Sequence, residues 1–199
     1  MKKYLIGIWL LAAFLCVPAG AWAGPPTDYV KRIMQKVMAI QNDPALAGPA
    51  HQDARARAIR QIIKENFDFP MMARDSLGPT YQRLSGAQAR EFEQTFASLF
   101  QDSYTRLVLN FLKQETIQYH QESQQGDRAQ VKTTIVRINE TIPVEYLMHS
   151  RSRSWVLYDV KVDGVSILKT YKDQFARVIR SKSFPFLLNR MKMQAQAID

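Results

Sequence analysis

Hydrophobic residues recur every three or four positions through the first half of the chain, which is the spacing of one face of a helix. The longest such run opens after Ser85, and Gln88 three residues later completes a capping box. An earlier run, with Thr27 or Asp28 as its expected cap, carries a broad apolar face as far as Gln41. The pattern predicts helices over residues 27–41, 52–65, 67–78 and 86–112.

After residue 113 the period changes to two, which indicates strands. Short turns join neighbouring segments, and strands joined in this way form an antiparallel meander. Helical spacing returns after Gly164, and a final turn or two follows near Phe184. The pattern predicts strands near residues 117–119, 128–138, 142–149 and 155–163. In the last strand, four residues are predicted to share one face: Val156, Tyr158, Val160 and Val162. Helices, a four-stranded antiparallel sheet and further helices predict a single α+β domain.

The first residues carry the pattern of a secretory signal peptide. Lys2 and Lys3 precede an apolar run over residues 4–17, which is too short to span a bilayer because that requires about 20 residues. The segment then ends in small residues at Ala21 and Ala23, the two positions that a signal peptidase reads. We therefore expect residues 1–23 to be cleaved off after Ala23.

Residues 24–199 are then expected to form one exported domain. A retained N-terminal anchor is the alternative, whereas the bulky Leu15 argues against a lipid anchor on Cys16. The chain has 27 basic and 18 acidic residues, a net charge of +9. An exported protein does not meet cytoplasmic nucleic acid, so this charge favours a phospholipid surface or an acidic protein as partner.

The sequence contains little material for catalysis. One cysteine and three histidines exclude a disulfide framework and a thiolate zinc site. There is no H-E-x-x-H pair, no nucleophile elbow and no phosphate-binding glycine loop. We expect Asp159 and Asp163 to be polar residues of a turn or strand edge. The chain is therefore predicted to be no enzyme and to hold no metal; a hydrolase of lipid or cell-wall polymer is an alternative without an identifiable nucleophile.

The chain is rich in apolar surface rather than in catalytic residues. The long helix and the central strands each present a continuous apolar face. A filled core and a lined cavity require the same faces, so periodicity does not separate them. A periplasmic adaptor domain whose apolar faces are all core, docking through the basic turn Arg151–Arg153, is one reading; a cavity for an apolar ligand is the other.

Two segments carry a family resemblance. FDFPMMARDSLG over residues 67–78 is one, and WVLYDVKVDGVSILKTYKDQF over residues 155–175 is the more specific. Together with the pattern of the long helix and IPVEY at residues 142–146, they resemble the MlaC family, also called toluene-tolerance auxiliary proteins. The similarity covers nearly all of the chain beyond the signal peptide.

This resemblance implies helices wrapped on a twisted sheet that enclose a hydrophobic lipid pocket. It also implies a periplasmic carrier that shuttles phospholipid between an outer-membrane lipoprotein and porin complex and an inner-membrane MCE-type ABC transporter. Bound phospholipid would be cargo, with no cofactor, and the carrier is expected to be a monomer. Some related proteins carry hopanoids, so another lipid is the alternative cargo.

Helix face and strand parity select the residues expected to line such a pocket. The candidate lipid-binding residues are Phe96, Phe100, Tyr104, Leu107, Val108, Val131, Ile135, Val144, Tyr146, Val156, Tyr158, Val160, Tyr171 and Phe175.

Overall fold

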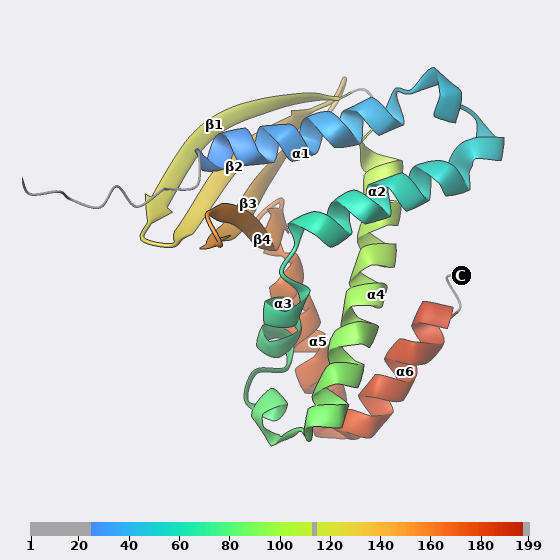
Figure 1. Cartoon of the computed structure of the whole chain (residues 1–199), viewed down its shortest axis with the longest axis vertical. Coiled ribbons are helices and arrows are strands. Elements are labelled where there is room, and N and C mark those ends of the chain that lie inside the picture. The colour runs from blue at the N-terminus through green and yellow to red at the C-terminus, as the bar shows by residue number, and fades with distance from the viewer. Residues whose placement is uncertain (1–24, 113–114, 197–199) are drawn as a thin grey trace, which may run out of the picture.

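The computed structural model describes residues 25–112 and 115–196 (Figure 1). The predicted signal peptide and its cleavage site lie outside the described residues. The helices are α1 (Pro26–Gln41), α2 (Gln52–Asn66), α3 (Phe69–Leu77), α4 (Gly86–Phe111), α5 (Ile167–Ser181) and α6 (Phe184–Gln196). The strands are β1 (Thr116–Gln125), β2 (Arg128–Val136), β3 (Thr141–Arg151), β4 (Ser154–Val162) and β5 (Val165–Ser166). Short 3-10 helices span Pro44–Leu46, Pro49–His51 and Gly78–Arg83.

The α+β class and the antiparallel meander are confirmed, with strand order β1-β2-β3-β4-β5. The prediction of four strands is wrong, because the described sheet has five. Asp163 and Gly164 have φ angles of 51° and 76° and form a tight turn. This turn folds Val165 and Ser166 back beside β4, whereas the sequence pattern ended the sheet at the glycine.

The helix ends follow local capping chemistry. Ser85 and Gln88 form the predicted capping box at the start of α4. The predicted cap of α1 is wrong, because Pro25 occupies the cap position and Pro26, which has no N–H to satisfy, opens the helix. Thr27 instead ties α1 to β1, since its N–H donates to the Glu122 carboxylate at 2.8 Å. Helix α6 is also longer than the predicted turn or two.

Helices α1 and α4 are oriented differently relative to the sheet. Figure 1 shows α1 lying across the strands β1 and β2, while α4 runs away from that end toward α3, α5 and α6. One end of the molecule is therefore helix on sheet and the other is helix on helix. No helix in the part of the chain that the structure describes is long and apolar enough to cross a membrane.

A bulge in β4 overturns the predicted face of that strand. Leu147 pairs with Asp159 and Met148 with Leu157, so Tyr158 has no partner on β3. Beyond this extra residue the parity is shifted, because each residue points to the opposite face from its neighbour. The inner face is Trp155, Leu157, Val160 and Val162. Val156 and Tyr158 do not share this face, contrary to the prediction.

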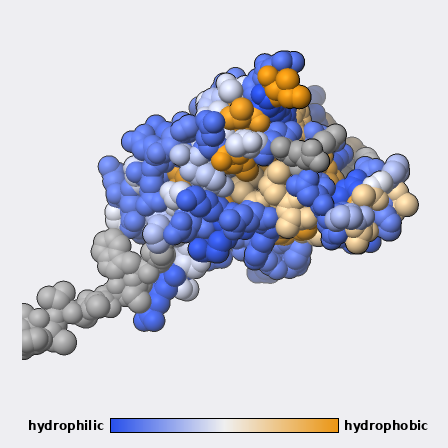
Figure 2. Space-filling model, turned by 90° about the horizontal axis from the view of Figure 1, so that it is seen from above, coloured by the Kyte–Doolittle hydropathy of each residue, from blue (hydrophilic) through white to orange (hydrophobic). Residues whose placement is uncertain are grey.

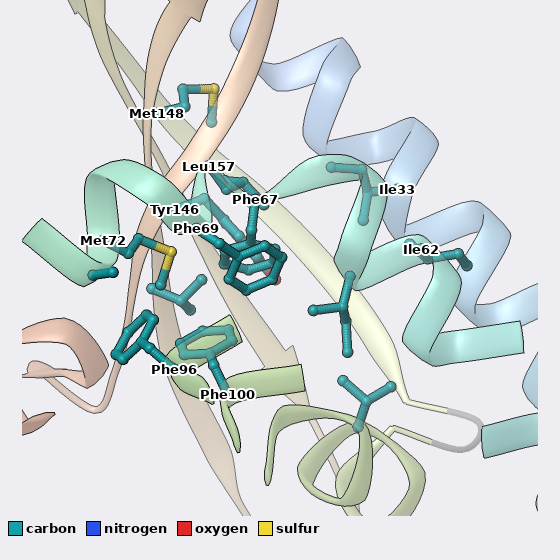
Figure 3. Packing of buried hydrophobic residues seen from close by; sticks show 14 of the residues in the cluster. Ile33, Ile62, Phe67, Phe69, Met72, Phe96, Phe100, Tyr146, Met148 and Leu157 are labelled. Carbon is teal, nitrogen blue, oxygen red and sulfur yellow. The ribbon is translucent and has the colours of Figure 1, made fainter. Parts of the chain in front are cut away.

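Aromatic rings fill the helical end of the core. The rings of Phe67 and Phe69 lie 5.3 and 5.7 Å from that of Phe100, and Figure 3 shows these rings beside Phe96 and the sheet residue Tyr146. The run continues along α4 and onto the last two helices through contacts among Phe92, Phe96, Tyr104, Tyr171, Phe175 and Phe184. Such rings, packed edge to face and stacked, fill the space around Phe92, Phe96 and Phe100, which are at most 1% exposed.

Candidate functional site

An apolar cavity of about 190 Å³ lies between the sheet, α1, α2 and the C-terminal end of α4. Its walls are almost entirely aliphatic and aromatic side chains. The lining residues are Ile33, Met34, Val37, Ile62, Ile63, Asn66, Phe67, Tyr104, Leu107, Val108, Phe111, Leu112, Ile135, Arg137, Ile142, Val144, Tyr146, Leu157 and Val162.

Periodicity explains why these side chains converge. Ile33 and Val37 are four residues apart on α1, so they share one face of the helix. Ile135 and Val144 lie on the inner face of neighbouring strands, where side chains alternate with period two. Helix α1 lies across the sheet (Figure 1), and the cavity lies between these two elements.

Two tyrosines, Tyr104 and Tyr146, line this cavity. The Tyr146 hydroxyl lies 3.6 Å from the Met34 sulfur, a weak acceptor. Burial raises the pKa of Tyr104 and of Tyr146 far above the ordinary tyrosine value. Both hydroxyls therefore stay neutral at physiological pH, and they add no charge to the cavity.

The cavity borders a polar outer hollow at the C-terminal end of α4. Arg137 lines both the cavity and a polar outer hollow of about 1150 Å³. Phe111, nearly half exposed, lines the cavity, and the fully exposed Ile138 lines the hollow. Figure 2 looks onto this end of the molecule and shows hydrophobic residues gathered within a hydrophilic surround. An apolar interior thus meets solvent through a partly polar mouth.

The structure brings part of the predicted set together here. The predicted residues that line the cavity are Tyr104, Leu107, Val108, Ile135, Val144 and Tyr146. Others lie in the filled core below it: Phe96, Phe100, Val131 and Val160. Val156 and Tyr158 lie on the other face of β4, where Tyr158 stacks under Arg128 at 4.8 Å.

Tyr171 and Phe175 line a second hollow. This open groove of about 730 Å³ lies among α4, α5, α6 and the end of the sheet. Leu107 contributes to both spaces, because it stands on the part of α4 that separates them. The predicted set was therefore divided between two hollows and the packed core.

Sequence reasoning missed the wall that α1 and α2 build. Ile33, Met34 and Val37, together with Ile62 and Ile63, face the cavity. Their helical periodicity was visible, but nothing in it says which element those faces will meet. Leu157 was missed for a different reason, since the bulge at its neighbour reverses the parity of the strand.

The buried carboxylates serve the architecture. Asp159 accepts hydrogen bonds from the Leu168 N–H at 3.0 Å and the Ser166 hydroxyl at 2.5 Å, which holds the start of α5 against β4. Asp68 caps α3 and lies 2.9 Å from His149 and 3.1 Å from Arg151 on β3. Among the described residues, no group of three His, Cys, Asp or Glu side chains could hold a metal ion.

The fold and its cavity define a class: a small α+β protein that encloses an apolar space between a curved sheet and crossing helices, with a polar mouth. Within that class, the chain belongs to the MlaC family, whose model, described as MlaC protein, matches residues 31–193. The predicted family is therefore confirmed.

Two relatives and one solved structure are similar to it. The intermembrane phospholipid transport system binding protein MlaC of Haemophilus influenzae is 25% identical over 125 residues, which are 60% of this chain and 58% of that protein. Toluene tolerance protein ttg2D of Pseudomonas putida is 23% identical over 169 residues, 84% of this chain and 78% of that protein. The match thus spans less than two thirds of the Haemophilus protein.

A phospholipid-binding protein from Ralstonia solanacearum, solved in complex with a phospholipid, has a similar fold. Its TM-score is 0.75 at 21% identity, and the alignment covers 87% of this chain and 98% of that one. At this identity the likeness concerns the fold.

Proposed function

We propose that this chain is a periplasmic lipid carrier that encloses phospholipid acyl chains in the cavity between α1, α2, α4 and the sheet. The observation that carries the proposal is the apolar cavity that borders a polar hollow at Arg137. This arrangement matches an amphipathic molecule, with its chains inside and its head at the mouth. The name of the Haemophilus relative and the phospholipid in the Ralstonia structure support the same assignment.

The energetics require such an enclosure. A buried methylene contributes about 0.8 kcal/mol, so exposing a sixteen-carbon chain to water costs on the order of 12 kcal/mol. Moving that chain from a bilayer into a protein interior exchanges one apolar environment for another and is close to balanced. Direction must therefore come from the partners that load and unload the carrier.

The size of the cavity adds a condition. Small-molecule pockets are typically about 300–1,000 Å³, and the space of about 190 Å³ is smaller. Acyl chains therefore require the wall to widen. That wall is the α1–α2 hairpin, which Gln41 ties to the end of α4 through a hydrogen bond to the Val108 carbonyl at 3.2 Å, and which Thr27 ties to β1.

The proposed route follows from the family. Cleavage after Ala23 delivers the domain to the periplasm as a monomer. It exchanges lipid with an outer-membrane lipoprotein and porin complex and with an inner-membrane MCE-type ABC transporter. Without Lys2 and Lys3, the cleaved domain keeps 25 basic and 18 acidic residues, and this net charge of +7 favours approach to anionic membranes or acidic partners.

Mass spectrometry of an organic extract from the purified exported protein tests the proposal. We expect phospholipid in the wild-type extract. Ile142→Glu places a charge on the cavity wall and is expected to empty it, whereas Thr141→Glu, exposed and one residue away, is expected to retain lipid. Circular dichroism of both variants verifies the fold.

Each other outcome has a defined meaning. An empty wild-type extract, with capture of a protein partner, would favour the adaptor domain and overturn the carrier. A hopanoid in place of phospholipid would keep the carrier and change its cargo. Equal amounts of bound lipid in Ile142→Glu and Thr141→Glu would show that lipid does not bind in the cavity between α1, α2 and the sheet.

A further inference from the structure

The outer hollow at the mouth of the cavity has a distinctive composition. It lies where the end of α4, the start of α2 and the turn between β2 and β3 meet. Its charged lining residues are Arg55, Arg137, Glu115 and Glu140. Side-chain amides supply further donors and acceptors: Gln41, Asn42, Gln52, Asn110 and Asn139. Among the described residues that line the hollow, positive and negative charges balance, although the whole chain carries +9.

Arg137 stands at the boundary between this hollow and the apolar cavity. It is the one charged side chain among the described residues that line the cavity. Its guanidinium lies 5.2 Å from the centre of the Phe111 ring and donates a hydrogen bond to the Phe111 carbonyl oxygen. It is only 22% exposed, so the cation is held in place at the mouth.

Two carboxylates flank this cation. Nη1 of Arg137 lies 3.3 Å from Glu140, and Nε lies 3.4 Å from Glu115. The Glu140 side chain is 59% exposed, so its pairing with Arg137 is weak and readily exchanged. A cation with a loosely held counter-ion is available to another anion, and the released carboxylate is available to another cation.

We propose that the outer hollow is the head-group site for a zwitterionic phospholipid. Arg137 binds the phosphate, because a guanidinium presents a planar fork of donors that matches phosphate oxygens. Glu140, whose pairing with Arg137 is readily exchanged, binds the ammonium group beyond it. Acyl chains in the cavity place the phosphate at its mouth, where Arg137 lies. This inference rests on the proposed function, since it requires acyl chains in the cavity.

A competition among three lipids with identical acyl chains tests the site. Delipidated full-length mature protein is loaded from vesicles that contain equal amounts of phosphatidylethanolamine, phosphatidylglycerol and diacylglycerol, and bound lipids are measured by mass spectrometry. The wild type is expected to favour phosphatidylethanolamine over both competitors. Arg137→Gln is expected to lower the ratio of phosphatidylethanolamine to diacylglycerol about tenfold, because hydrogen bonds to charged groups have this order of effect.

A second lipid ratio measures the contribution of the Glu140 carboxylate. Glu140→Gln is expected to lower the ratio of phosphatidylethanolamine to phosphatidylglycerol about two- to threefold, the scale of an exposed ion pair. Arg180→Gln, which is exposed on α5 and lines neither the cavity, the outer hollow nor the groove, serves as the matched control and is expected to leave both ratios unchanged. If Arg137→Gln fails to fold, Glu140→Gln and Arg137→Lys test the site in its place. For Arg137→Lys, the ratio of phosphatidylethanolamine to diacylglycerol is expected to be lower than in the wild type but still above one.

The outcomes separate the two proposals. Wild-type protein that takes up no lipid would overturn the proposed function and this inference together. Lipid uptake with ratios unchanged by Arg137→Gln and Glu140→Gln would overturn the head-group site and leave the carrier intact. Inorganic phosphate is added in a parallel arm: if it abolishes the preference for phosphatidylethanolamine over diacylglycerol, the site is a free-phosphate site and the inference is wrong. A preference that appears only for vesicle binding, and not in the bound lipid, would assign the hollow to a membrane surface instead.

Discussion

Replacing Val144 with phenylalanine places added atoms where the structure has space. Val144 is buried on the inner face of β3, opposite Thr133 and Val162, and it lines the cavity of about 190 Å³. Phenylalanine adds four carbon atoms. Taking each as about the ~30 Å³ that a water molecule occupies in the liquid, they need roughly 120 Å³, so the added atoms fit.

The sign of the stability change follows from this space. At about 0.8 kcal/mol for each buried methylene, the added atoms stabilise the lipid-free protein by up to about 3 kcal/mol. The same atoms occupy volume that acyl carbons would otherwise fill. Lipid affinity is therefore expected to fall by a similar free energy, which corresponds to roughly a hundredfold.

Val131→Phe is the matched control. Val131 lies on the same inner face of the neighbouring strand and is 1% exposed, but it lies in the filled core and does not line the cavity. The same substitution there overpacks the core and is expected to destabilise the protein by about 1–3 kcal/mol. Urea unfolding of delipidated protein and quantification of bound lipid measure both effects for each variant.

The two variants refute the reasoning if they behave alike. Equal destabilisation at Val144 and Val131 would show that the space beside β3 is not available to a side chain. Full lipid binding by a stable Val144→Phe variant would show that acyl chains lie elsewhere, with the groove lined by Tyr171 and Phe175 as the next candidate.

Two further predictions concern buried polar groups. Asp159→Ala removes the acceptor for the Leu168 N–H and is expected to destabilise the protein by about 2–3 kcal/mol in urea unfolding, whereas Asp173→Ala, an exposed partner of a lysine on the same helix, is expected to change stability by less than about 0.5 kcal/mol. Burial raises the pKa of Tyr104 and Tyr146, so the folded state holds these protons more tightly than the unfolded state. The free energy of unfolding that these two tyrosines contribute is therefore fully present below the unfolded-state pKa of about 10. Above that pH it falls by about 1.4 kcal/mol per pH unit for each tyrosine. Tyr146→Phe should reduce this slope, and an unchanged slope would contradict the raised pKa of Tyr146.

Local patterns predicted most elements to within a few residues. The capping box at Ser85 and the long apolar face behind it lead directly to α4. The alternation around Val144 and Tyr146 leads to β3 and to its buried face. These signals succeed because hydrogen bonding along a helix and alternation along a strand depend on residues close together in the chain.

The candidate site was predicted less completely. Tyr104 and Phe100 are four residues apart on one face of α4, yet Tyr104 lines the cavity while Phe100 packs against Phe67 and Phe69. Nothing in their spacing separates them, because both rings pack against Phe67 at the α2–α3 junction. The difference depends on segments far away in sequence, such as α3, whose Phe69 packs against Phe100. The bulge at Tyr158 likewise has no local signal, and it exchanges the faces of its neighbours.

The order of residues along this chain was sufficient to establish the class of fold, the positions of most helices and strands, and the supply of apolar faces. Whether those faces meet or stand apart depended on the angle at which α1 and α2 cross the sheet and on where α4 ends. An apolar side chain lowers its free energy equally well by covering another element or by bordering an enclosed apolar space. Packing geometry between distant segments, which no local spacing records, therefore separates the cavity at Val144 from the filled core at Val131.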